Sequence, residues 1–99
     1  MQSDVKTIYN KNQDIISRTI LDETILVPIS GNLANMQNIF SLDSVSAFIW
    51  EHIDGTKTLN DIHQLVVHVF DVEASQALKD IYEFIDELEN SELIAIAEG

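Results

Sequence analysis

The stretch that decides the fold runs from Asn35 to Gly55 and reads NMQNIFSLDSVSAFIWEHIDG. Up to Leu42 the side chains point alternately to two sides, as in a β-strand, and most of the apolar ones share one side. Beyond Leu42 the period lengthens to about 3.6 residues, which is typical of a helix with one apolar stripe. Asp43 stands between the two patterns and is a suitable N-cap residue. The stretch therefore predicts a strand over residues 35–42, followed by a helix over residues 44–53.

Two segments rich in β-branched residues precede this stretch, from Ile15 to Leu21 and from Thr24 to Ile29. They predict a β-hairpin that turns at Asp22-Glu23. Pro28 has no N–H group to donate, so the second strand is expected to end or bulge there. Residues 1–12 are polar, and we expect them to form a flexible tail.

Two further helices follow the first. Thr58 and Asp61 have the spacing of a capping box, which opens the second helix. The third helix is the longest, from about Glu73 to Asn90. Its central apolar stripe consists of Ala74, Leu78, Ile81, Ile85 and Leu88. After it, Leu93 to Ala97 forms either a short strand or a packed tail.

The third helix also carries apolar residues beside its central stripe. Ala77 and Phe84 lie on one flank and Tyr82 lies on the other, so the apolar surface is wider than one interior face requires. Either both flanks are covered by the other helices and the sheet, or one of them lines an exposed groove.

Three strands followed by three helices predict an α+β fold. We expect a winged-helix-like arrangement, in which a three-stranded antiparallel sheet is followed by a three-helix cluster. The 99 residues suit one domain with one core. The chain contains no cysteine, so packing alone must stabilise this domain.

The charge of the chain is strongly acidic. Five basic and 17 acidic residues give a formal net charge of -12, which argues against nucleic acid as a partner. The same charge attracts a basic peptide or a basic patch on an enzyme, or it serves only solubility. No apolar run is long enough to span a membrane and no signal peptide opens the chain, so we expect a cytoplasmic protein.

The sequence contains no convincing set of catalytic groups. The histidines His52, His63 and His68 are scattered, and zinc sites usually need three or four convergent ligands. The few glycines do not form a phosphate-binding loop, and the carboxylates of the third helix are spread around its outward surface. We therefore predict a protein that is not an enzyme and that needs neither a metal nor a cofactor.

The third predicted strand says more about function than the search for catalytic groups does. In a simple meander this strand lies at the edge of the sheet, and from Asn35 to Ser41 it contains neither a charge nor a proline to block pairing. An open edge of this kind can bind an extended peptide by strand addition. It can also pair with its own copy, so we expect a monomer or a weak homodimer.

An ordered set of motifs from Phe40 to Ile94 resembles the PqqD family. The motifs are Phe40-Ser41-Leu42-Asp43, Phe48-Ile49-Trp50-Glu51, Ile53-Asp54-Gly55, Thr58-Leu59-Asn60-Asp61-Ile62, Phe70-Asp71-Val72, Ile81-Tyr82-Glu83-Phe84-Ile85-Asp86-Glu87-Leu88 and Glu92-Leu93-Ile94. The chain departs from the usual pattern at Asp43, where asparagine is common, but both residues can cap a helix.

The resemblance implies a recognition domain for the leader segment of a ribosomally made precursor peptide. Such a domain does no chemistry and delivers the peptide to a modifying enzyme, such as a radical SAM protein, a cyclase or a leader peptidase. Its groove lies between the third strand and the third helix, while Trp50 and Gly55 are structural. Carried over to this chain, the peptide-binding residues are Asn35, Met36, Gln37, Asn38, Ile39, Phe40, Ser41, Ile81, Phe84, Ile85 and Leu88.

Two other functions remain open at this point. A winged-helix domain that binds DNA has the same architecture, although the acidic charge opposes it. A pure adaptor subunit would bind an enzyme through the acidic face of the third helix and would bind no peptide. The resemblance also leaves the precursor and the pathway undetermined.

Overall fold

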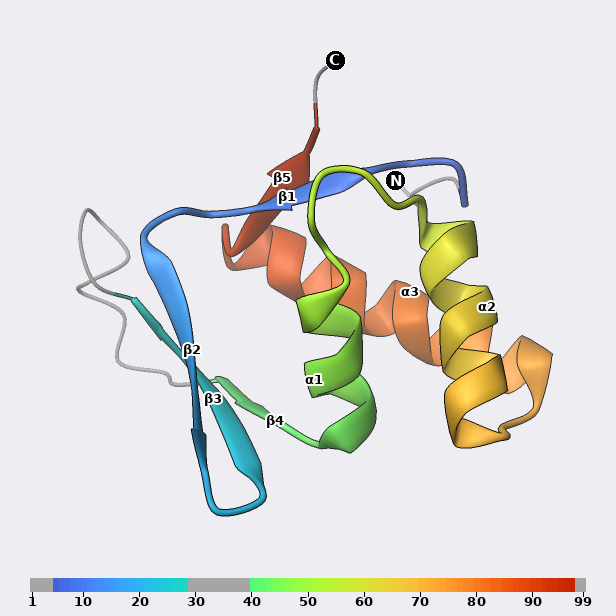
Figure 1. Cartoon of the computed structure of the whole chain (residues 1–99). Coiled ribbons are helices and arrows are strands. Elements are labelled where there is room, and N and C mark those ends of the chain that lie inside the picture. Colours follow the sequence, from blue (N-terminus) through green and yellow to red (C-terminus); the bar gives the residue numbers. More distant parts are fainter. Residues whose placement is uncertain (1–4, 29–39, 98–99) are drawn as a thin grey trace.

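The computed structural model describes residues 5–28 and 40–97. Within these residues the chain forms an α+β fold of two small antiparallel sheets and three helices (Figure 1). The elements in chain order are β1 (Tyr9–Lys11), β2 (Ile15–Ile20), β3 (Glu23–Pro28), β4 (Phe40–Leu42), α1 (Ser44–Glu51), α2 (Leu59–Phe70), α3 (Ala74–Asn90) and β5 (Ile94–Ile96). The predicted fold class, a three-stranded antiparallel sheet followed by three helices, is confirmed.

The larger sheet has the strand order β2-β3-β4, as expected for a meander. The hairpin closes at the pair Ile20–Glu23, one residue earlier than predicted, so Leu21 and Asp22 form the loop. Leu21 adopts a φ of 56°. Pro28 is the last residue of β3, where its missing N–H costs the sheet least.

The third strand of this sheet is seen only at its end. β4 begins at Phe40, which pairs with Leu26, and it ends at Leu42, which pairs with Thr24. The remainder of the predicted strand, from Asn35 to Ile39, lies outside the described residues. Because Asp43 follows β4 directly and caps α1, the edge of the sheet leads without a loop into the helices (Figure 1).

The expectation of a flexible tail over residues 1–12 needs a correction. Tyr9–Lys11 forms β1, which pairs antiparallel with β5. Tyr9 is 2% exposed, and its hydroxyl donates a hydrogen bond of 3.2 Å to Oε1 of Glu89 at the end of α3. Burial of this aromatic ring fixes the segment on the domain. The same pairing shows that Leu93 to Ala97 contains a strand and is not merely a packed tail.

Local capping explains where the helices begin. Oδ1 of Asp43 accepts a hydrogen bond of 2.8 Å from the N–H of Ser46 at the start of α1. The predicted capping box is present at α2, where Thr58 and Asp61 each accept a hydrogen bond from the other's backbone N–H. These bonds satisfy donors that the first helical turn leaves without an intrahelical partner.

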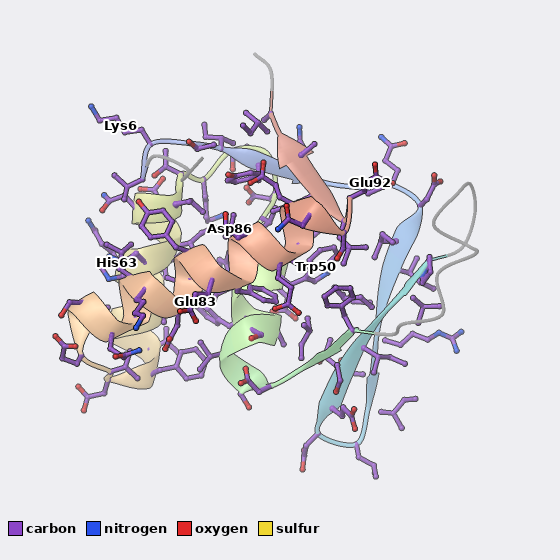
Figure 2. All side chains as sticks on the ribbon, turned by 180° about the vertical axis from the view of Figure 1, so that it is seen from behind. Lys6, Trp50, His63, Glu83, Asp86 and Glu92 are labelled. Carbon is purple, nitrogen blue, oxygen red and sulfur yellow. The ribbon has the colours of Figure 1, made fainter. Side chains whose placement is uncertain are left out.

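One core joins the helices to both sheets. Trp50 of α1 is 2% exposed, and α3 lies across α1 and α2 in both views (Figures 1 and 2). The apolar side chains buried there come from all three helices and from each of the strands β1 to β5: Tyr9, Ile15, Leu26, Leu42, Ile49, Trp50, Ile53, Leu59, Ile62, Val66, Ala77, Ile81, Ile85, Leu88, Leu93 and Ile94. No helix in the described part of the chain is long and apolar enough to cross a membrane.

Candidate functional site

The edge of β4 is the first part of the candidate site. Among the described strands, β4 pairs only with β3, so its other edge carries backbone groups without a ladder partner. Leu42 points into the core, Phe40 packs partly against it, and Ser41 is exposed. The hydroxyl of Ser41 donates a hydrogen bond to Oε1 of Glu23 on β3. The strand is therefore anchored on one face and on one edge.

A pocket at the end of β4 is the second part. It has a volume of about 300 Å³ and lies between α1, the start of α3 and the connection from α2 to α3. Its apolar lining comes from Val45 and Ile49 of α1, Val66 of α2, Val72, and Ala77 and Phe84 of α3. Such a pocket can hold an apolar side chain or an apolar stem.

A larger hollow of about 710 Å³ lies elsewhere, beside β1 and β5. It is more open than the pocket at β4, and it is lined mostly by polar residues and backbone of the small sheet, such as Asn10, Asn12 and Glu92. Its lining includes no aromatic residue and does not include Asp43, the residue that follows β4. We therefore regard the less open pocket beside Asp43 and Phe84 as the better candidate site, although it is smaller.

The four predicted residues of α3 separate into two groups. Ile81, Ile85 and Leu88 are each 0% exposed and belong to the core. Phe84 is half-buried and lines the pocket. Of the four, only Phe84 thus reaches a surface that a ligand can contact, while the other three support the helix from inside. Phe40 and Ser41 lie on β4, and the other predicted residues, Asn35, Met36, Gln37, Asn38 and Ile39, lie outside the described part of the chain.

The structure also decides which flank of α3 lines a pocket. Ala77 and Phe84 face it together, whereas Tyr82 on the opposite flank packs partly against the core. The spacing of Ala77, Asp80 and Phe84 by three and four residues was the available signal, because such residues share one helix face. Val45, Ile49 and Val66 gave no such signal, since their spacing in α1 and α2 looks like that of ordinary core residues.

Carboxylates surround the apolar lining of the pocket. Asp43, Glu73 and Asp80 all border it. Glu73 caps α3 and accepts hydrogen bonds from Ser75 and Gln76, which hold the pKa of its carboxyl below the usual value. Asp80 accepts a hydrogen bond of 3.0 Å from the side-chain amide of Gln76. All of these donors are neutral, so the hydrogen bonds leave the negative charges in place.

Trp50 and Gly55 have the structural roles that the sequence suggested. The Nζ atom of Lys11 lies 5.2 Å from the ring centre of the buried Trp50, a cation–π contact. Burial lowers the pKa of Lys11, while Glu51 and Asp54 oppose that shift. Gly55 has a φ of 81°, and its N–H donates a hydrogen bond of 3.0 Å to the carbonyl of Tyr9. Neither residue lines the pocket at β4.

Two of the histidines contact backbone carbonyl groups. Nδ1 of His52 lies 2.8 Å from the carbonyl oxygen of Phe48, and Nε2 of His63 lies 2.7 Å from that of Ala74. Within residues 5–28 and 40–97, no group of three or more His, Asp or Glu side chains is placed to hold a metal ion.

Fold and site together define a small winged-helix-like α+β domain with an edge strand that leads to a pocket. The family described as "Coenzyme PQQ synthesis protein D (PqqD)" matches residues 23–94, and the chain belongs to this family. A solved structure, "TbiB1 in Complex with the TbiA(beta) Leader Peptide", has the same fold, with a TM-score of 0.70 and 24% sequence identity. The match covers 86% of this chain and 93% of that one. No curated protein matches the sequence.

Proposed function

We propose that this chain binds the leader segment of a ribosomally made precursor peptide and presents it to a modifying enzyme. The leader adds a strand to the free edge of β4, and one of its side chains enters the pocket beside Phe84. The observation that carries the proposal is that β4, one edge of which has no partner strand among residues 5–28 and 40–97, ends beside an apolar pocket at Asp43. Membership of the PqqD family supports it, as does the leader peptide named in the complex of the similarly folded TbiB1.

The edge of β4 and the pocket have different roles in the proposed site. Main-chain hydrogen bonds to β4 supply affinity for any extended peptide, and the pocket supplies selectivity for one side chain. Among the residues that the structure describes, Phe40, Ser41 and Phe84 are the proposed contacts, and the proposal also includes Asn35 to Ile39. Ile81, Ile85 and Leu88 act indirectly, because they fix α3 and hence the position of Phe84.

The expected affinity is moderate. About four main-chain bonds at roughly 1 kcal/mol each and two or three apolar anchors at about 1.5 to 3 kcal/mol each oppose ordering costs of several kcal/mol. The balance corresponds to micromolar or somewhat tighter binding. Binding of this strength suits capture of the precursor followed by its release to the enzyme.

Calorimetric titration with a synthetic leader, taken from the precursor encoded beside this chain, tests the proposal. We expect saturable one-to-one binding with a dissociation constant of about 1 to 10 μM. The titration is repeated with the same residues in scrambled order, which keeps composition and charge. Absence of binding up to about 1 mM, or equal binding of the scrambled peptide, would overturn the proposal.

An adaptor function is the second candidate, and one observation favours it. Glu83, Asp86 and Glu87 are exposed on α3 and are not part of the pocket. Figure 2 labels Glu83 and Asp86 on this helix. The three residues form an acidic surface that suits a basic patch on an enzyme. Under the adaptor hypothesis, neutralising these three residues together should weaken enzyme binding, and neither the wild type nor the variant should bind the leader.

Several further expectations belong to the same proposal. Presentation to a modifying enzyme requires no catalytic group, metal or cofactor in this chain. We expect a cytoplasmic monomer or weak homodimer, because the free edge of β4 can also pair with its own copy. We expect no binding to nucleic acid, which a band-shift experiment at low salt checks.

A further inference from the structure

The pocket at β4 combines an apolar lining with an acidic border. Val45, Ala77 and Phe84 contribute apolar surface, while Asp43, Glu73 and Asp80 lie around it. None of these three carboxylates forms an ion pair within the described residues, where the salt bridge is that of Lys57 with Asp54. A purely apolar ligand would bring no charge to balance them.

Two of the carboxylates cap helices, a role that a neutral side chain can also fill. Asp43 caps α1, but asparagine is an equally good N-cap residue and is neutral. Glu73 caps α3, a position for which serine, threonine and asparagine are also preferred. Asp80 lies within α3 and caps nothing. Helix capping therefore does not explain why three negative charges border one pocket.

The helix dipoles do not cancel these charges. The N-termini of α1 and α3 both lie at the pocket, and each contributes roughly half a positive charge. Against three carboxylates this leaves a net charge of about -2 around the opening. Glu73 is favoured as the deprotonated carboxylate, because its hydrogen bonds lower the pKa of the carboxyl.

We propose that the pocket at β4 selects a lysine or arginine side chain of the bound peptide. The aliphatic stem of that side chain lies on Phe84 and Val45, and its cationic head lies among Asp43, Glu73 and Asp80. Lysine and arginine bury their stems on apolar surface while the charged head stays near water, which fits a pocket of about 300 Å³ with an open acidic border.

This inference rests on the proposed function and makes it more specific. Asp43 is the residue after β4, so a peptide strand paired with Phe40–Leu42 comes to the pocket as it passes the end of the strand. Affinity then comes from the main chain and from the stem, and the choice among peptides comes from the charge. The recognised segment is an extended one with a basic residue, rather than an apolar residue, at the pocket position.

Isosteric neutralisation tests the inference. The variants Asp80→Asn and Asp43→Asn each remove one charge from the pocket, and Asp43→Asn also keeps the helix cap. The control Asp86→Asn removes one charge from an exposed site on α3 outside the pocket. The probe is the synthetic leader used above, together with leaders in which each Lys or Arg in turn is replaced by norleucine.

For the two pocket variants we expect about a threefold to tenfold loss of leader affinity and a weaker dependence on salt. Asp86→Asn should change affinity less than about twofold. One norleucine leader should bind the wild type at least as weakly as the original leader binds Asp80→Asn, and its affinity should not fall further on that variant. If the wild type binds the leader but all three variants bind it equally, the inference is wrong and the proposed function stands. If the wild type binds no leader, the proposed function itself fails.

Discussion

Asp43 and Phe84 line the same pocket, although one follows β4 and the other lies in the middle of α3. The pocket on the flank of the helix thus begins one residue after the end of β4. In the proposed complex, a peptide that pairs with β4 would reach the pocket as it passes the end of the strand, so that main-chain pairing and a side-chain pocket would act together.

Replacement of Phe84 by alanine should weaken leader binding about tenfold or more. The ring is the aromatic part of the pocket, and loss of its apolar contact costs about 1.5 to 3 kcal/mol of binding free energy. Calorimetric titration of the folded variant measures the change. Tyr82→Ala is the matched control, because Tyr82 is also a half-buried aromatic residue of α3 but lies on the other flank.

The pair of variants separates binding from folding. Both substitutions remove a ring that packs partly against the core, so both should lower the melting temperature by similar amounts. Only Phe84→Ala should weaken the complex. Equal losses of affinity in the two variants would mean that the flank of Phe84 does not contact the leader.

Replacement of Gly55 by alanine should lower the free energy of unfolding by about 1 to 3 kcal/mol. Gly55 has a φ of 81°, and a Cβ atom there would lie 2.2 Å from Oδ1 of Asn10. Chemical denaturation measures the loss. In a chain that already carries Asn10→Ala, Gly55→Ala should no longer cause the clash with the Asn10 side chain, while the cost of the positive φ remains. Gly55→Ala should therefore lower the free energy of unfolding less in that chain than in the wild type. An equal cost in both backgrounds would show that Asn10 moves aside freely.

Replacement of Tyr9 by alanine should lower the free energy of unfolding by about 3 to 5 kcal/mol, because a fully buried ring is lost. Tyr9→Phe keeps the ring and removes the hydroxyl that donates to Glu89, so it should cost only about 0.5 to 1.5 kcal/mol. Denaturation of both variants checks the ranking. A loss below about 1 kcal/mol for Tyr9→Ala would restore the view that the N-terminal segment is a loose tail.

Asp54 should make stability depend on pH in the acidic range. Hydrogen bonds from Lys57 and Thr56 hold the pKa of its carboxyl well below the usual 3.8. The folded chain therefore releases this proton more readily than the unfolded chain does. The contribution of the Asp54 carboxylate to the stability of the fold is complete at pH values above 3.8 and is lost as the pH falls below 3.8. The stability difference between wild type and Asp54→Asn should be largest near neutral pH and shrink on acidification. Parallel curves for the two proteins down to pH 2 would contradict this account.

The helices and most of the sheet could be predicted from local signals. The capping box of Thr58 and Asp61 and the proline at the end of β3 act within a few residues, and both are present in the structure. Of the stripe predicted for α3, Ile81, Ile85 and Leu88 are buried. Ala74 is exposed and Leu78 is only half-buried, while Ala77, which was predicted on a flank, is buried in their place. The strand over Tyr9–Lys11 has only three residues and shows no clear alternation. Its partner is β5 at the opposite end of the chain, so no local pattern could reveal it.

The candidate site could be predicted only in part. The width of the apolar surface on α3 left two alternatives open, a covered flank or an exposed groove, and the packing of α1 and α2 decided that Ala77 and Phe84 line a pocket. The same packing buried Ile81, Ile85 and Leu88, which share the apolar character of a contact surface. The acidic border was hidden because Asp43 and Glu73 look like ordinary helix caps in the sequence.

The most direct test of leader capture at β4 is an NMR titration of isotope-labelled protein with the leader peptide. The account predicts that the largest shifts occur in Phe40–Leu42 of β4 and at Ala77, Asp80 and Phe84 of α3, with little change in β1 and β5. Shifts confined to the outer face of α3, or shifts that appear only after the neighbouring enzyme is added, would contradict leader capture and identify an adaptor.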